Sequence, residues 1–111
     1  MKVRTTQLGV AVYLAPDSAL TADNVEGLGE SVRAAGGDGP TNIVLDLKNV
    51  PLIDSMGLEF LLDLAHRLRE GGGSLRLANV NSLCREALAI TELDQVIPVY
   101  EDLDGAGRSF L

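Results

Sequence analysis

The chain has 111 residues and a formal net charge of −7, and 46% of its residues are hydrophobic. This length and this balance fit one globular domain and exclude a disordered chain. The negative charge argues against nucleic acid and against an anionic membrane surface as partners, because phosphate contacts need clustered Lys and Arg.

Cysteine and histidine usage narrows the possible sites further. Cys84 is the only cysteine and His66 the only histidine, so the chain can form no internal disulfide and lacks the ligands of a usual zinc site. No run approaches the roughly 20 apolar residues of a membrane helix, and the N-terminus has no signal-peptide pattern. These features predict a cytoplasmic protein without a metal or cofactor.

The first third of the chain predicts two strands and a helix. Lys2–Gln7 alternates weakly, and we expect it to pair across Leu8-Gly9 with the apolar run Val10–Leu14. From Thr21 the apolar residues recur with the spacing of a helix instead of that of a strand, and Thr21 is the predicted N-cap of this helix. The expected inner face of that helix consists of Val25, Leu28, Val32 and Ala35.

The middle of the chain alternates between strands and helices. Asn42–Leu47 is almost continuously apolar, as expected of a central strand covered on both faces. A helix from about Ser55 to Arg69 follows, then a strand at Ser74–Asn79, then a third helix capped by Asn81 or Ser82. The expected core stripe of the second helix is Leu58, Leu61, Leu62, Ala65 and Leu68, and that of the third is Leu83, Ala87 and Ile90.

The C-terminal part predicts a short strand and a marginal helix. The strand is Val96–Tyr100, where Pro98 indicates a sheet edge or a strand end. The helix lies within Glu101–Leu111 and places Leu103, Ala106 and Phe110 inward. Gly-rich segments at 36–40 and 71–73 are interpreted as turns within one domain. The whole order predicts an α/β fold with a small mixed sheet, largely parallel from Asn42 onward.

The loop before the second helix is the predicted functional segment, because strand–loop–helix junctions usually hold the working residues of α/β proteins. Ser55 stands at or just before the helix N-terminus, where free N–H groups and the helix dipole favour an added negative charge. Asp54 and Glu59 would repel that charge. The alternative is that Ser55 or Asp54 is only a helix cap. Gly57 suits either close approach of a partner or close packing on the sheet.

No set of residues indicates an enzyme. A Ser-His-Asp triad would require His66, which lies eleven residues along the same helix from Ser55, roughly 16 Å away. Gly71–Gly73 precedes a strand and lacks the Lys and Ser/Thr of a phosphate-binding loop. Asp46 is placed like the phospho-acceptor of a receiver domain, but the acidic pair and the late Lys of that chemistry are absent. The chain is therefore predicted to bind another protein and not to be an enzyme.

Four segments resemble the STAS domain, and in particular the bacterial anti-sigma factor antagonists. They read NIVLDL at Asn42–Leu47, IDSMGL at Ile53–Leu58, GGSLRL at Gly72–Leu77 and ITELDQVI at Ile90–Ile97. The resemblance covers nearly the whole chain and is strongest after residue 41. It implies a single STAS domain over residues 1–111, with a small mixed sheet and helices packed mainly on one side.

The resemblance also implies that Ser55 is a phosphorylation site in a partner-switching cycle. Unphosphorylated protein would bind an anti-sigma factor that is also a serine kinase and so free a sigma factor. Phosphorylation by that kinase would end binding, and a PP2C-type phosphatase would restore the serine. The expected partner-binding residues are Asp54, Met56, Gly57, Leu58, Glu59, Asp63 and Asp17.

Two positions depart from the family pattern. Met56 stands where the family often has Ser or Thr. Ala15-Pro16-Asp17-Ser18 replaces a Gly-x-x-Asp turn of the family, and this second departure leaves open whether Asp17 positions Ser55. The alternative function is a STAS interaction subunit of a transporter or signalling assembly that is never phosphorylated. The sequence leaves the oligomeric state open, including a homodimer through the tail helix.

Overall fold

The structure is a computed structural model that describes residues 1–36 and 40–111. Its described part contains a five-stranded sheet in the order β1-β2-β3-β4-β5, in which β1 is antiparallel to β2 and every other pair is parallel. The strands are β1 (Val3–Leu8), β2 (Ala11–Pro16), β3 (Asn42–Asp46), β4 (Ser74–Ala78) and β5 (Val99–Tyr100). The predicted mixed sheet is confirmed.

The hairpin that opens the chain forms as predicted. Gly9, in the turn between β1 and β2, has a φ of +59°, a left-handed conformation that glycine adopts at little cost. Gly71 ends the second helix, and Gly72 and Gly73 connect it to β4, as expected of a turn. The other predicted turn, at 36–40, lies largely outside the described residues.

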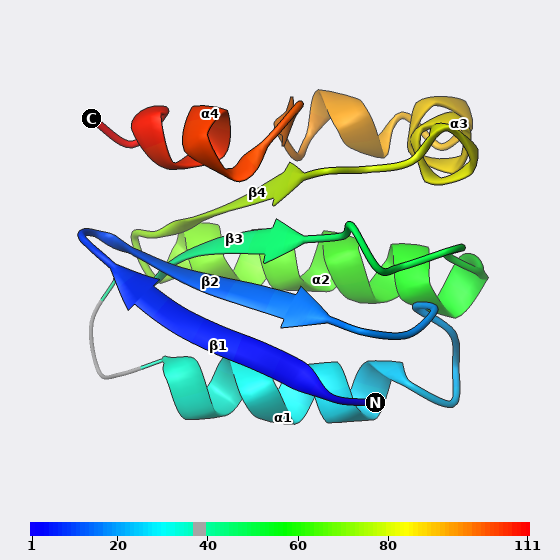
Figure 1. Ribbon diagram of the computed structural model, residues 1–111, viewed down its shortest axis with the longest axis horizontal. Coiled ribbons are helices and arrows are strands. Elements are labelled where there is room, and N and C mark those ends of the chain that lie inside the picture. Colours follow the sequence, from blue (N-terminus) through cyan, green and yellow to red (C-terminus); the bar gives the residue numbers. More distant parts are fainter. Residues whose placement is uncertain (37–39) are drawn as a thin grey trace.

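Helices cover the two faces of the sheet unequally. Those in the described part are α1 (Val25–Ala35), α2 (Ser55–Glu70), α3 (Ser82–Ile90) and α4 (Leu103–Arg108), and a short 3₁₀ turn, η1 (Leu93–Gln95), precedes β5. Figure 1 shows α1 and α2 side by side behind the sheet, while α4 lies beside the β4 end. The prediction that helices pack mainly on one side is confirmed.

Two separate cores correspond to the two faces. The larger one is built from leucine, isoleucine and valine side chains of the sheet together with α1, α2 and α3. The smaller one consists of Ala11, Val44, Ala78 and Ala106, small residues that let α4 approach the sheet closely. Because Ile43 and Val44 are both fully buried yet point to opposite faces, β3 is covered on both sides as predicted.

Three predicted details are wrong, and contacts between distant segments explain two of them. Thr21 is not the cap of α1: the helix begins at Val25 behind Asn24, because Leu20 pairs with Ile53 in a parallel bridge and fixes the preceding segment. In α3, Leu83 and Ile90 do not face inward; they are 58% and 75% exposed.

The predicted cap Asn81 is correct, and it explains the true orientation of α3. Its side-chain oxygen accepts the Cys84 N–H at 2.8 Å, while its Nδ2 group donates to the carbonyls of Val50 and Pro51. This anchor turns Cys84 and Leu88 into the core. The third error concerns β5, which is shorter than predicted because η1 precedes it and Pro98 offers no N–H to the ladder.

The predicted tail helix is confirmed as α4. Ala106 is buried, and Leu103 and Phe110 are half-buried against the smaller core. In α2, Leu61 and Ala65 are buried as predicted and Leu64 joins them, while Leu58 packs half-buried at the edge of the larger core.

Candidate functional site

Ser55 is the first residue of α2 and is exposed. Asp54 is the N-cap: its Oδ1 atom accepts the Gly57 N–H at 2.9 Å, and its backbone carbonyl accepts the Leu58 N–H. The capping role that the sequence left between two residues therefore belongs to Asp54. The Ser55 hydroxyl is left at the surface, at the positive end of a 16-residue helix.

The Asp54 carboxylate also joins two segments that are distant in the sequence. Its second oxygen, Oδ2, accepts the backbone N–H of Ala22 at 3.3 Å. Beside it, the Leu20 N–H donates to the Leu52 carbonyl, and the Asp54 N–H donates to the Leu20 carbonyl, both at 3.0 Å. The segment between β2 and α1 is thus held against the loop that precedes α2 and Ser55.

Gly57 is buried beneath this junction. A Cβ atom at this position would overlap the Leu20 carbonyl oxygen and lie 2.8 Å from Cγ2 of Ile53. Backbone cannot yield as a flexible side-chain tip can, so the position requires glycine for close packing. Of the two interpretations that the sequence allowed for Gly57, packing is the one that these contacts support.

The exposed residues near Ser55 in the sequence are apolar or acidic. Leu52 is 41% exposed and Met56 45% exposed, although both are large and apolar. Glu59 and Asp63 follow Ser55 at intervals of four residues along α2, so the three polar side chains share one exposed face. Leu58 contributes only a half-buried side chain to this region.

Asp17 has its own partners at the start of the sheet. Its carboxylate accepts the Lys2 N–H and the Ser18 hydroxyl, each at 2.9 Å. These hydrogen bonds, that from Lys2 first, lower the pKa of Asp17 below its ordinary value. Leu20 and Ala22, rather than Asp17, make the described contacts with the Ser55 loop. Sequence reasoning missed both, although Leu20 is the one large apolar residue between Pro16 and Val25.

Asp46, His66 and Cys84, the other residues considered for chemistry, lie apart from Ser55 in the sequence. Asp46 accepts hydrogen bonds from the Lys48 N–H at 3.1 Å and from Asn79 Nδ2 at 2.9 Å, as expected of a strand-end residue. His66 is exposed on α2, and Cys84 is fully buried, which raises the pKa of its thiol.

The part of the chain that the structure describes contains neither a cluster of potential metal ligands nor a membrane-spanning helix. Within residues 1–36 and 40–111, no three His, Cys, Asp or Glu side chains gather as metal ligands would. In the same part of the chain, no helix is both long and apolar enough to cross a membrane.

Comparisons with known proteins agree with this architecture. A protein of Bordetella bronchiseptica named as an anti-sigma factor antagonist, BtrV, is 26% identical over 110 residues, which cover 99% of this chain and 95% of BtrV. The structure of an anti-sigma-factor antagonist (STAS) domain protein from Planctomyces limnophilus superimposes with a TM-score of 0.84 at 25% identity, covering 98% of this chain and 97% of that one.

Two proteins with lower sequence identity share the fold. The anti-sigma factor antagonist SpoIIAA of Bacillus matches with TM-scores of 0.75 unphosphorylated and 0.70 phosphorylated, at 15% identity; the match covers 97% of this chain and 96% and 99% of the two SpoIIAA chains. The murine anion transporter Slc26a9 matches at 0.78 and 21% identity over 89% of this chain and 17% of the transporter. The STAS domain model itself matches residues 2–106, so this chain belongs to the STAS domain family.

Proposed function

We propose that this protein is an anti-sigma factor antagonist that works by partner switching at Ser55. The observation that carries the proposal is an exposed serine at the first position of α2, with two exposed apolar residues, Leu52 and Met56, close to it in the sequence. Asp54 fixes the junction between the loop that contains Leu52 and the first turn of α2, so the surface is formed before a partner arrives. The likeness to BtrV over almost the whole chain supports the same assignment.

Phosphorylation would change this surface in two ways. A phosphate adds about −1.5 to −2 charges, which the α2 N-terminus stabilises by about 0.3–1 kcal/mol. It would also lie one turn from Glu59 and beside Leu52 and Met56. Any apolar partner contact there would have to desolvate the phosphate, so the modified protein would lose its partner.

The partner proposed is an anti-sigma factor that is also a serine kinase. In that kinase the Ser55 hydroxyl would attack the γ-phosphorus of ATP, lose its proton to a base of the kinase and release ADP. A PP2C-type phosphatase would hydrolyse the phosphoserine. The cycle would run in the cytoplasm, where ATP is available, and this chain would be a ligand and a substrate in it.

A matched pair of variants tests the switch. Ser82 is also an exposed serine at the first position of a helix, α3, behind a capping residue, Asn81. Ser55→Asp is expected to weaken binding to the cognate anti-sigma factor at least about tenfold, equivalent to 1.4 kcal/mol. Ser82→Asp and Ser55→Ala should bind normally in isothermal titration calorimetry. Equal affinity for both Asp variants would contradict the proposal and favour the unphosphorylated interaction subunit.

A further inference from the structure

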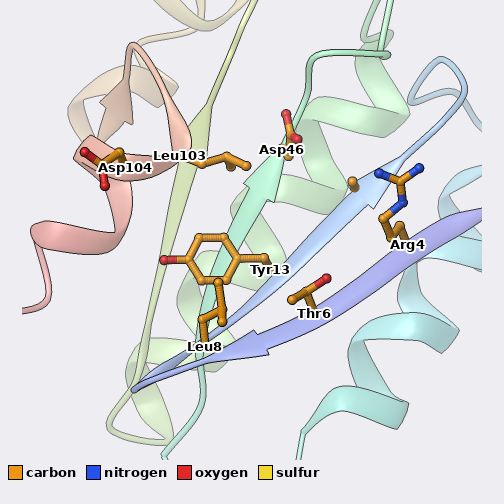
Figure 2. Close-up of a pocket in the computed structure, with 8 residues that line it drawn as sticks. Arg4, Thr6, Leu8, Tyr13, Asp46, Leu103 and Asp104 are labelled. Carbon is orange, nitrogen blue, oxygen red and sulfur yellow. The ribbon is translucent and has the colours of Figure 1, made fainter.

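The sheet face opposite α1 and α2 is only half covered. α4 lies over β3, β4 and β5 and covers Ala11 at the start of β2, but leaves β1 and the end of β2 around Ala15 open beside it. A hollow of about 440 Å³ lies where the open part of the sheet meets α4, and it is bounded by β1, β2, the end of β3 and α4. Figure 2 shows its side chains. Its volume lies within the 300–1,000 Å³ of small-molecule sites.

One side of the hollow is an apolar surface held in place by packing. The half-buried Tyr13 ring lies across the sheet with its hydroxyl toward α4 (Figure 2), where a Cβ atom at Gly107 would overlap the hydroxyl oxygen. Gly107 therefore makes room for this ring position. Leu8, 61% exposed, lies beside the ring, and Leu103 points from α4 toward the sheet. An apolar body would lie on this surface.

The other side of the hollow is polar and carries Arg4 and Asp46. Arg4 is opposite Ala15 in the hairpin register, and the parallel register that pairs Leu14 with Leu45 places Ala15 next to Asp46. Because Ala15 is small, a gap remains between the Arg4 and Asp46 side chains. A second hollow of about 640 Å³ shares Arg4, Ala15 and Asp46 and adds Lys2 and Lys48. We name the two joined hollows the hairpin trough.

The charges in the trough are unusual for this chain. Three of its nine basic residues line the trough, although the net charge is −7, and no acidic residue precedes Asp17. The ion pairs in the described part of the chain are Arg85–Glu101 and Arg108–Asp104, so none engages these three cations.

Acidic groups are also present in the trough. The carboxylates of Asp17 and Asp46 accept hydrogen bonds from the Lys2 and Lys48 backbone N–H groups, and that of Asp104 is paired with Arg108. Hydrogen bonds or an ion pair therefore already hold all three, while the side-chain cations of Lys2, Arg4 and Lys48 keep their capacity for an anionic ligand.

We propose that the hairpin trough binds a small organic anion with an apolar body. Its phosphate or carboxylate head would lie among Lys2, Arg4 and Lys48, and its body would lie on Tyr13, Leu8 and Leu103. A phosphate monoester has three terminal oxygens that can accept hydrogen bonds from these three side chains, whereas a carboxylate has two, so we expect the phosphate to bind more tightly. This site is separate from Ser55, and its test does not depend on partner switching.

The test is a ¹H–¹⁵N NMR titration with octyl phosphate, octanoate and octanol, probes that share one chain length and differ in the head group. We expect saturable shifts at Arg4, Thr6, Tyr13 and Leu103, with affinity falling from octyl phosphate to octanoate to octanol. Arg4→Gln should weaken octyl phosphate binding about five- to tenfold, the range between exposed and buried charged hydrogen bonds. Arg33→Gln, an exposed arginine on α1, should leave it unchanged.

Four results would overturn the proposal. Octanol binding as tightly as octyl phosphate would show an apolar patch without an anion site. Shifts centred on Leu83 and Ile90 would place the ligand on α3 instead. Equal effects of Arg4→Gln and Arg33→Gln would show that only net charge matters. Inorganic phosphate serves as a fourth arm: binding equal to that of octyl phosphate would refute the role of the apolar surface.

Discussion

The Asp54 carboxylate has two roles: it caps α2, and it ties the segment before α1 to the loop before α2. Removing it should abolish both. Loss of a helix cap costs about 1 kcal/mol, within a range of about 0.5–2. Loss of the longer bond to Ala22, at 3.3 Å, adds about 0.5 kcal/mol, the lower end for a hydrogen bond. We therefore expect Asp54→Ala to lower the free energy of unfolding by about 1–2.5 kcal/mol.

Two further variants make the measurement specific. Asp54→Asn retains one oxygen for the Gly57 N–H and loses the other. It should therefore lower the free energy of unfolding by about 0.5–1 kcal/mol. Asp102 caps α4 through the Gly105 N–H at 2.7 Å, so Asp102→Ala removes a cap elsewhere and should cost about 1 kcal/mol. Urea unfolding of the three variants gives these differences directly.

Partner binding is the second readout for the same variants. Asp54→Ala should bind the anti-sigma factor more weakly than wild type, because the loop that presents Leu52 and Met56 loses its anchor. Asp102→Ala should bind normally. Unfolding of Asp54→Ala and Asp54→Asn at the same urea concentration as wild type would contradict both roles of Asp54. Equal loss of binding in Asp54→Ala and Asp102→Ala would contradict a specific effect at the Ser55 end of α2.

Three other changes have defined outcomes. Gly57→Ala should destabilise the fold by about 1–3 kcal/mol in thermal unfolding, because its methyl group meets the Leu20 carbonyl, while Gly71→Ala should be almost neutral; equal effects would be inconsistent with the packing. The lowered pKa of Asp17 stabilises the fold above its unfolded pKa, a contribution lost as pH falls through the folded pKa, so Asp17→Asn should flatten the acid side of the melting-temperature profile between pH 2 and 6. The raised pKa of buried Cys84 gives stability that is full below about pH 9 and is lost as pH rises through the folded pKa; dithionitrobenzoate should label this thiol rapidly in urea and very slowly in buffer at pH 8, and rapid labelling of the native protein would contradict its burial.

The elements with strong local patterns were predictable from sequence. β3 has a continuous apolar run, and α2 has a regular leucine stripe with glycine at its end, so neighbouring residues alone define them. The hairpin was predictable because Gly9 lies between two alternating runs.

What the sequence did not reveal depends on contacts between distant segments. The start of α1 depends on the Leu20–Ile53 bridge, and the orientation of α3 depends on the bonds from Asn81 to the loop before α2. In the candidate site, spacing alone allowed either Ser55 or Asp54 to cap the helix, and only the backbone path shows that Asp54 does. The hairpin trough likewise needed the strand register and the position of α4.

The central claim is that Ser55 is a phosphorylated switch, and the most direct test is to incubate the protein and its Ser55→Ala variant with ATP and the anti-sigma kinase of its own genome. Intact mass and peptide mapping then count and locate the phosphates. We expect one phosphate, on Ser55, absent from the variant and accompanied by loss of binding to the kinase. An unmodified Ser55 in a protein that still binds that kinase tightly would contradict it.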